Sequence, residues 1–390
     1  MFVPRVLSVK LQQAAQQFPV LFLTGPRQSG KTTLLKQTFP DYRYVNLEDP
    51  EMRAWALEQP KDFLQVNSWP VIIDEAQYAP ELFSYIQLIT DNHQKAGMFL
   101  LSGSQNFLLM EKITQSLAGR SAILNLFPLS YTELAGAGID DETNIMILKG
   151  FFPRIYQSID EVSLFYKSYI NTYVERDVRQ LANIGNLNDF VRFIKLCAGR
   201  TGQLLNLSSL ATEAGIAYNT CKSWLSWLSA GFVLQLVQPH YKNFNKKIVK
   251  APKIYFNDTG LLCNLLGINS TETLALHPLR GSIFENLIYI ELIKQRMNSA
   301  KDSNIWFWRD NHGTEIDFIL EEALTLTAID VKPGMNFHDA YLKNLLLFKK
   351  YNPDVGKLFL VYDGQLSREK NDISIINWKR FMAMLYEQVV

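Results

Sequence analysis

The chain has 390 residues, 47% of them apolar and 20% charged, which is ordinary for a folded protein and excludes a disordered chain or a small peptide scaffold. At about 150 residues per domain, this length predicts two or three domains. The 39 Lys and Arg nearly balance the 38 Asp and Glu, so the net charge is +1. Any surface that attracts nucleic acid or membrane must therefore be local.

The cysteines and histidines fit neither a disulfide framework nor a zinc site. Cys197, Cys221 and Cys263 are odd in number and widely separated, and the five histidines never recur at helical ligand spacing. The N-terminal residues lack the basic and apolar stretches of a signal peptide, and no run approaches about 18 apolar residues. We expect a cytoplasmic protein without a membrane segment.

Residues 1–135 are predicted to form a parallel α/β core. Five short apolar runs alternate there with helical patterns, and they cover residues 20–24, 42–47, 71–74, 98–102 and 122–127. Residues 136–200 have a helical pattern that predicts a lid or linker. Ser130-Tyr-Thr-Glu133, just before it, fits a capping box.

Two further units are predicted toward the C-terminus. In residues 201–265, helical patterns at 207–214 and 217–228 flank a break at Gly215, and strands follow at 232–237 and 253–256, the outline of a winged helix. Residues 266–390 read as a separate α/β domain. Its expected order is a helix at 281–296, strands at 305–309, 314–320 and 324–331, a helix at 339–351 and a strand at 357–362.

A phosphate-binding motif directly follows the first apolar run. Residues 25–32 fit G-x-x-x-x-G-K-[ST] at every fixed position, between a strand and a helical pattern, which is the context that the motif requires. Lys31 would reach the β and γ phosphates of ATP, and the Thr32 hydroxyl would ligate Mg²⁺. The expected nucleotide contacts come from Gly25, Pro26, Arg27, Gln28, Ser29, Gly30, Lys31, Thr32 and Thr33. The alternative is an ordinary glycine turn before a helix.

Two adjacent carboxylates end the third predicted strand. Parallel strands present ligand sites at their carboxyl ends, so we expect Asp74 to hold Mg²⁺ and Glu75 to orient and deprotonate the attacking water. A catalytic glutamate beside this aspartate favours hydrolysis over nucleotide binding alone. The alternative is a solvated Asp-Glu pair at a strand end.

Three further positions are expected to sense the nucleotide. Ser102 ends the fourth strand in Ser102-Gly-Ser104, where a hydroxyl could sense the γ-phosphate, although a plain turn also fits. Arg120 or Arg176 could act as an arginine finger or a lid sensor, and each could equally be a surface salt-bridge partner. An arginine acting in trans would require a homo-oligomer.

Several motifs together resemble one family, the prokaryotic AAA-type P-loop ATPases that carry a C-terminal domain of unknown function. They are the P-loop, Ile-Asp-Glu-Ala-Gln, Leu-Leu-Ser-Gly-Ser-Gln, Ser-Leu-Ala-Gly-Arg, Tyr-Val-Glu-Arg-Asp-Val, Pro-Lys-Ile-Tyr-Phe-Asn-Asp-Thr-Gly-Leu and Glu-Ile-Asp-Phe. The resemblance runs along nearly the whole chain. It implies a P-loop ATPase core, a winged helix and a nuclease-like C-terminal fold. Asp330 stands where the family pattern leads us to expect Glu.

The C-terminal carboxylates follow the helix, strand, strand order of the PD-(D/E)XK nucleases. Glu285, Asp317 and Asp330 could hold one or two Mg²⁺ ions, and Lys332 shares a face with Asp330 and could position the nucleophile. Other readings stay open. Ser282-Ile-Phe-Glu285 also fits a capping box, and Lys332 could pair with Asp317 as a buried ion pair without catalysis.

A basic segment lies where the wing of the winged helix would be. Lysines at 242, 246, 247, 250 and 253 occur without an intervening acid, interleaved with Tyr241 and Phe244. They could track DNA phosphates while Tyr218, Asn219 and Lys222 of the second helix approach a groove. The alternative is a solvated hairpin or a docking surface. We expect DNA to be bound through Lys242, Lys246, Lys247 and Lys250.

The sequence thus predicts a multidomain protein that couples ATP hydrolysis to action on DNA, with Mg²⁺ as the metal and with a metal-dependent nuclease domain. Two alternatives remain. One is a nucleotide-switched DNA-binding or regulatory protein whose nuclease fold is silent. The other is a signalling ATPase whose winged helix is a protein-docking surface.

Overall fold

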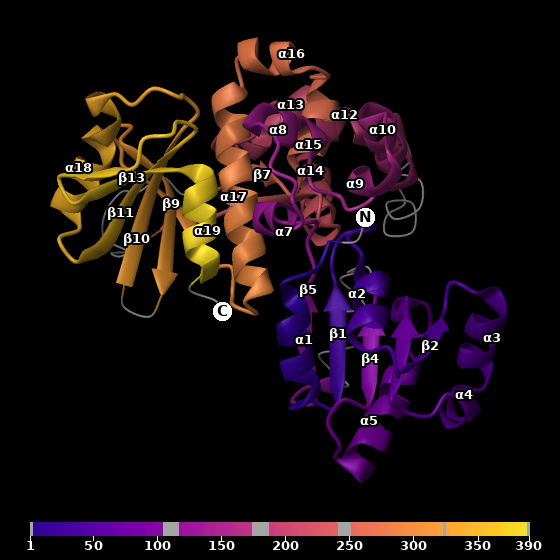
Figure 1. The fold of residues 1–390 in the computed structure, drawn as a ribbon. Helices are drawn as coiled ribbons and strands as arrows, with labels where there is room; N and C mark the ends of the chain where they lie inside the picture. The colour runs from indigo at the N-terminus through magenta and orange to yellow at the C-terminus, as the bar shows by residue number, and fades with distance from the viewer. Residues whose placement is uncertain (1–2, 104–116, 174–186, 241–250, 323–324, 388–390) are drawn as a thin grey trace.

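The computed structural model describes residues 3–103, 117–173, 187–240, 251–322 and 325–387. Arg176, Ser104, Lys242, Lys246, Lys247 and Lys250 lie outside these residues. Figure 1 shows a first α/β unit, a helical middle part and a second α/β unit at the C-terminal end. Within the described residues, no helix is both long enough and apolar enough to cross a membrane.

The first unit is a parallel five-stranded sheet in the order β2-β3-β4-β1-β5, which confirms the predicted parallel core. The strands are β1 (Val20–Thr24), β2 (Arg43–Asn46), β3 (Val71–Asp74), β4 (Phe99–Ser102) and β5 (Ser121–Asn125). The helices are α1 (Leu7–Ala15), α2 (Lys31–Thr38), α3 (Pro50–Glu58), α4 (Pro60–Val66) and α5 (Leu82–His93), with a 3₁₀ turn η1 (Ala76–Tyr78). β1, β3 and β4 are completely buried because apolar clusters cover both faces of the sheet.

The middle part is mostly helical. It contains α7 (Tyr131–Gly136), α8 (Thr143–Lys149), α9 (Ile155–Ser158), α10 (Val162–Tyr173), α12 (Leu187–Ala198), α13 (Leu207–Ala214), α14 (Tyr218–Ala230), α15 (Thr259–Leu266) and α16 (Thr271–Leu276). The predicted capping box is present, because Ser130 and Glu133 exchange side-chain and backbone hydrogen bonds at the start of α7. Gly215 ends α13 with a φ of +71°, a left-handed conformation that favours glycine.

Strands β6 (Leu234–Val237) and β7 (Lys253–Phe256) form an antiparallel pair after α14. The helices α13 and α14 and both strands lie close to where the sequence predicted them. An isolated bridge joins Pro239 to Phe307, so this pair also contacts the C-terminal unit.

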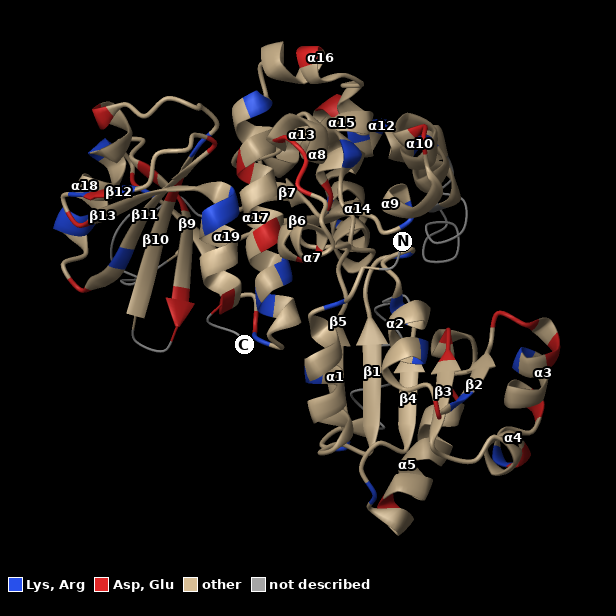
Figure 2. Ribbon diagram, in the orientation of Figure 1, with Lys and Arg blue, Asp and Glu red and all other residues tan. Residues whose placement is uncertain are grey.

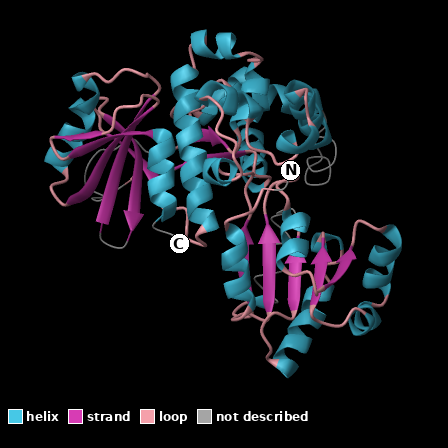
Figure 3. Cartoon of the chain, in the orientation of Figure 1, coloured by secondary structure: helices cyan, strands magenta, loops and turns pink. Residues whose placement is uncertain are grey.

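The C-terminal unit is a mixed six-stranded sheet in the order β12-β13-β11-β10-β9-β8. Its elements are α17 (Arg280–Asn298), β8 (Ile305–Arg309), β9 (Glu315–Glu322), β10 (Thr325–Lys332), η3 (Asp339–Leu342), α18 (Lys343–Tyr351), β11 (Val355–Tyr362), β12 (Arg368–Lys370), β13 (Ile373–Asn377) and α19 (Trp378–Glu387). β12, β13 and α19 were not predicted from the sequence. Figure 3 shows α17 and α19 side by side next to this sheet.

Helix α17 is the structural link between the parts. It is buried along most of its length, and it contacts α1 and β5 of the first unit, β7 and α15 of the middle part, and β10 of its own unit. Charged residues of both signs occur in all three parts of the ribbon in Figure 2.

Candidate functional site

The P-loop connects β1 to α2 at the carboxyl edge of the first sheet. Gly25 has a φ of +147°, and a Cβ there would collide with the carbonyl oxygen of Leu126. Gly30, the residue before α2, has a φ of +94°. Both positions need glycine because their backbone conformation or close contacts exclude a side chain. The loop is therefore built as the motif requires.

Lys31 folds back into this loop. Its ammonium donates hydrogen bonds to the carbonyl oxygens of Gly25 at 3.0 Å and Pro26 at 2.9 Å, and the residue is only 7% exposed. The positive charge is thus held where the phosphates of a nucleotide would lie, at the N-terminus of α2.

Asp74, at the end of β3, receives three hydroxyl groups. The Thr32 hydroxyl donates to Oδ2 at 2.6 Å, the Tyr44 hydroxyl donates to the same oxygen at 2.9 Å, and the Ser102 hydroxyl donates to Oδ1. The structure therefore brings together three of the side chains that the sequence singled out. Tyr44 was missed. The available signal was its place on β2, the strand that pairs with β3.

Tyr44 stays protonated in this environment. Burial, followed by the charge of Asp74, raises the pKa of its phenol. The hydroxyl is thus kept as a hydrogen-bond donor, which fixes the orientation of the Asp74 carboxylate.

Glu75 directly follows β3 in a left-handed conformation, with a φ of +55°. Burial raises the pKa of its carboxyl, while the charge of Lys31 and a hydrogen bond from Gln77 lower it. A carboxylate with a raised pKa is a better proton acceptor, which is the property that a general base needs. Gln77 was not recognised in the sequence, where only its place two residues after Glu75 could have indicated it.

A cavity of about 420 Å³ adjoins the P-loop. Three of the predicted nucleotide contacts line its wall, namely Gln28, Gly30 and Thr33. Further lining residues come from the N-terminal segment and from the residues around α9: Val3, Arg5, Pro153, Arg154 and Gln157. With Leu129, which follows β5, the cavity is bordered by four separate segments of the chain.

Arg120 does not lie in this site. It immediately precedes β5, at the amino edge of the parallel sheet, whereas the P-loop leaves the carboxyl edge. Its guanidinium pairs with Asp91 at 2.5 and 3.0 Å. The length of β5 separates Arg120 from the P-loop of its own chain, and the pair with Asp91 fits the salt-bridge alternative. A role of Arg120 as an arginine finger acting in trans stays a prediction.

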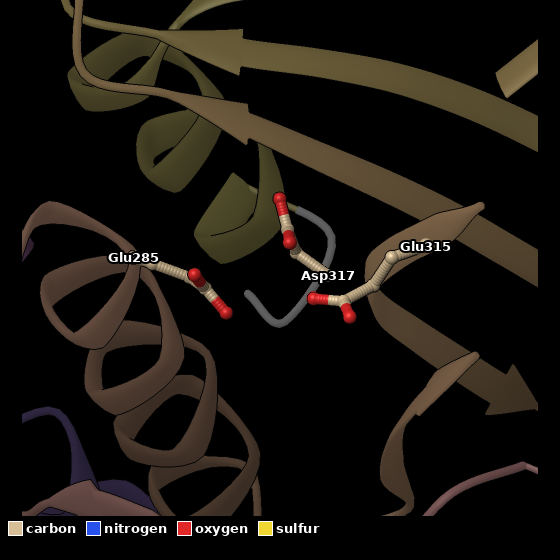
Figure 4. A group of neighbouring side chains, drawn as sticks. All are labelled: Glu285, Glu315 and Asp317. Atoms are coloured by element: carbon tan, nitrogen blue, oxygen red, sulfur yellow. The ribbon is translucent and has the colours of Figure 1, made fainter. Parts of the chain in front are cut away.

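A second cluster of polar groups lies in the C-terminal unit. Glu285 of α17 and Glu315 and Asp317 of β9 each offer a carboxylate oxygen, and these oxygens lie within 4.8 Å of one another. Figure 4 shows Glu285 facing the two strand carboxylates. We call these three residues the acidic cluster. Glu315 was missed, although its spacing of two from Asp317 places both side chains on one face of the strand.

The acidic cluster is bound to a lysine from the middle part. The Lys253 ammonium of β7 lies 2.9 Å from Glu285 and 3.9 Å from Asp317, and it also pairs with Glu315. Lys253 is 1% exposed, and burial lowers its pKa less than the three carboxylates together raise it. A buried cation thus already lies among the carboxylates that were expected to bind a metal.

Glu285 does not cap its helix. Helix α17 begins at Arg280, before Ser282, and no side-chain cap hydrogen bond forms there, so the capping-box reading is wrong. The carboxylate instead accepts hydrogen bonds from Lys253 and the Tyr255 hydroxyl. Burial raises its pKa to about 7, although Lys253 opposes the shift.

Asp330 and Lys332, on β10, lie beside Asp317 of β9. Ile329 of β10 pairs with Phe318 of the antiparallel strand β9, so Asp330 and Asp317 are neighbours on these two adjacent strands. The Lys332 ammonium is 2.9 Å from Asp330 Oδ2, and Asp317 accepts a hydrogen bond from the Val331 amide at 2.7 Å. Burial and the charge of Asp317 raise the pKa of Asp330 well above its usual value. The expected lysine pairing is present, but with Asp330 as the partner at ion-pair distance.

The described part of the predicted DNA surface is the outer face of α14. Tyr218, Asn219 and Lys222 are exposed there, whereas Cys221, Trp224, Leu225 and Leu228 are buried. Lys253, the last lysine of the predicted basic segment, is not on this surface, because it is buried in the acidic cluster.

Comparison with protein families matches each part of the chain. Residues 17–135 match the model described as an AAA domain. Residues 141–272 and 280–381 match two domains of unknown function, DUF8612 and DUF4143. The first unit, with its P-loop and with Asp74 and Glu75 at the end of β3, which is the Walker B strand, is therefore an AAA-type P-loop ATPase domain.

Relatives match most of the chain. The uncharacterized proteins Rv2008c of Mycobacterium tuberculosis and Mb2031c of Mycobacterium bovis are both 30% identical over 322 residues, which is 81% of this chain and 71% of theirs. An uncharacterized protein of Haemophilus influenzae is 22% identical, with 79% of this chain and 81% of that protein covered. The chain belongs to the family of the two mycobacterial proteins.

Solved structures give more distant similarities. The Walker-type ATPase paby2304 of Pyrococcus abyssi is 15% identical with a TM-score of 0.46, and the match covers 67% of this chain and 94% of that one. AMPPCP-bound DnaA from Aquifex aeolicus is 11% identical with a TM-score of 0.28, over 57% of this chain and 86% of DnaA.

Proposed function

We propose that the protein hydrolyses ATP at the carboxyl edge of the first sheet. The observation that carries this proposal is the 2.6 Å hydrogen bond between the Thr32 hydroxyl and Asp74, beside the Lys31 ammonium in the P-loop. The two oxygen groups come from the loop and from the Walker B strand, and hard oxygen ligands are those that Mg²⁺ prefers. Thr32 and Asp74 would therefore hold Mg²⁺.

Each neighbouring residue has a role in this proposal. Lys31 exchanges its carbonyl partners for the β and γ phosphate oxygens, and Glu75 accepts a proton from the attacking water. Mg²⁺, when bound, supplies charge neutralisation on the phosphates. Ser102 and Tyr44 hold the Asp74 carboxylate in place through their hydroxyl groups. The adjoining cavity of about 420 Å³ is large enough to take the base and ribose.

ATP turnover by the purified full-length protein tests this function. We expect phosphate release from ATP in the presence of Mg²⁺ and none in the presence of EDTA. Tyr85→Phe is a suitable control variant, because Tyr85 is exposed on α5 away from the P-loop. A wild-type protein that neither binds nor hydrolyses MgATP would contradict the proposal.

We further propose that α14 and the basic segment after β6 bind DNA, and that ATP hydrolysis is coupled to an action of the protein on that DNA. The exposed Tyr218, Asn219 and Lys222 on one face of α14 support this second function. Lys222→Glu should weaken DNA binding and lower the slope of its salt dependence by about one unit. Lys195→Glu, on an exposed position of α12, is the matched control. An unchanged affinity and salt slope in Lys222→Glu would favour the protein-docking alternative, and equal losses in both variants would contradict a DNA contact specific to α14.

For the C-terminal unit, we propose a nuclease-like fold whose site is silent in this conformation. The position of Lys253 among Glu285, Glu315 and Asp317 supports this proposal, because the ammonium supplies the positive charge that a divalent ion would otherwise supply. We expect no cleavage of linear or branched DNA with Mg²⁺ or Mn²⁺. Metal-dependent DNA cleavage that is lost in Asp330→Ala would overturn this proposal and would support an active nuclease site.

A further inference from the structure

Arg5 is a buried charged residue that neither the sequence motifs nor the proposed chemistry uses. It precedes α1, and its side chain is 5% exposed. Its guanidinium reaches three parts of the chain that are far apart in sequence: the P-loop, the segment after β5 and the start of α7. Arginine suits such a position because its planar head carries five fixed donors.

The contact with the P-loop is made at Ser29. Arg5 Nη1 donates to the Ser29 carbonyl oxygen at 2.8 Å. In a trans peptide the C=O and the following N–H point in opposite directions, so this bond also fixes the direction of the Gly30 amide. That amide belongs to the group of P-loop N–H donors that face phosphate in this motif.

The other contacts anchor Arg5 to residues 127–133, which we call the linker. Nη2 donates to the Phe127 carbonyl at 2.6 Å, and Nε donates to Glu133 Oε1 at 3.1 Å. The Glu133 side chain is fully buried, and its second oxygen accepts from the Ser130 amide at 2.8 Å. The guanidinium is thus held by a fixed carboxylate.

Helix α17 holds the same linker from another direction. The Lys294 ammonium donates to the Leu129 carbonyl at 2.8 Å and to Glu291 at 2.7 Å, and Glu291 accepts from the Tyr131 amide at 2.8 Å. The Glu291 and Lys294 side chains are 0% and 1% exposed. The linker is therefore anchored on two sides, which makes it a rigid support for Arg5.

We propose that Arg5 is a positioning residue of the nucleotide site, which holds the Ser29 peptide of the P-loop against the linker so that the loop is ready for phosphate. This role rests on the proposed ATP hydrolysis. Loss of the guanidinium leaves the peptide free to turn and costs affinity for ATP as well as turnover. A purely structural role would lower the melting temperature alone.

Arg5→Met in the full-length protein tests the role, with MgATP as the ligand. We expect at least about tenfold weaker MgATP binding and a lower kcat, because a hydrogen bond from a charged donor is stronger than one between neutral groups. Arg5→Lys should recover part of the affinity, since an ammonium can still donate to one of the carbonyls. Arg296→Met is the matched control. It removes another buried arginine that pairs with Glu322 at 3.0 Å, so it should lower the melting temperature and leave MgATP binding unchanged.

Glu133→Gln gives an independent test if Arg5→Met does not fold. It keeps Arg5 but removes its counter-charge and one of the two acceptor oxygens that serve Arg5, Val6 and Ser130. We expect a smaller loss of MgATP affinity in the same direction. Folded Arg5→Met, or folded Glu133→Gln, with the affinity and kcat of the wild type would overturn the inference. Wild-type protein that fails to bind MgATP would instead contradict the proposed function.

Discussion

The Lys253 ammonium lies 2.9 Å from the Glu285 carboxylate, and this pair joins β7 of the middle part to the first helix of the C-terminal unit. Lys253 also pairs with Glu315, which in turn accepts from Arg309 at 3.0 Å. Neighbouring hydrogen bonds reinforce the junction, since Asn286 accepts from the Phe256 amide at 2.7 Å and donates to its carbonyl at 2.8 Å. The acidic cluster therefore acts as a structural junction between the two parts.

Replacing Lys253 by Met should destabilise the protein strongly. The substitution leaves buried carboxylates without their cation, and the expected loss in the free energy of unfolding is about 3–5 kcal/mol. Urea denaturation measures this loss. Lys301→Met is the control, because Lys301 is 47% exposed and pairs with Glu322 at the surface, so its loss should be below about 1 kcal/mol. Similar losses in the two variants would contradict the junction.

The junction should also respond to pH through Glu285. Burial raises the folded-state pKa of Glu285 from 4.5 to about 7, so its contribution to stability is fully present below pH 4.5 and is lost as the pH rises through 7. Glu285→Gln removes this titration. We expect the free energy of unfolding of the wild type, relative to the variant, to decline between pH 4.5 and 7 by at most about 1.4 kcal/mol per pH unit. Parallel profiles for the two proteins would show that Glu285 titrates normally.

Local patterns in the sequence predicted the nucleotide site because its parts follow strands at fixed spacings. The runs 20–24 and 71–74 match β1 and β3, and both lead directly into Lys31, Thr32, Asp74 and Glu75. Tyr44 and Arg5 were not predicted, since their roles depend on which segments meet in space. Sequence spacing carries no information on such long-range contacts.

The C-terminal site shows the same limit. The order of α17, β9 and β10 was predicted from apolar periodicity, and Glu285 and Asp317 do come together. The cation beside them comes from β7, where Lys253 precedes Glu285 by 32 positions in the chain. In the sequence, Lys253 lies next to the predicted wing, where a basic residue indicates a DNA contact. Only the fold shows that Lys253 is buried.

The rate of ATP hydrolysis should fall as the pH is lowered through the raised pKa of Glu75. Burial favours the protonated carboxyl, and a protonated Glu75 cannot accept a proton from water. Gln77→Leu removes a hydrogen bond that lowers this pKa, so the acid limb of the kcat profile should move to higher pH. Assays of phosphate release from ATP between about pH 4 and pH 9 measure this shift of the acid limb. An acid limb that stays in place in Gln77→Leu would exclude Glu75 as the titrating group.

Lys31→Ala and Glu75→Gln, compared for MgATP binding and turnover, test the central claim most directly. We expect Lys31→Ala to lose MgATP binding, because the lysine neutralises phosphate charge. Glu75→Gln should bind MgATP as the wild type does and lose at least about 100-fold in kcat. Titration with labelled ATP beside a single-turnover assay separates the two effects. Hydrolysis at the wild-type rate by Glu75→Gln would contradict the account.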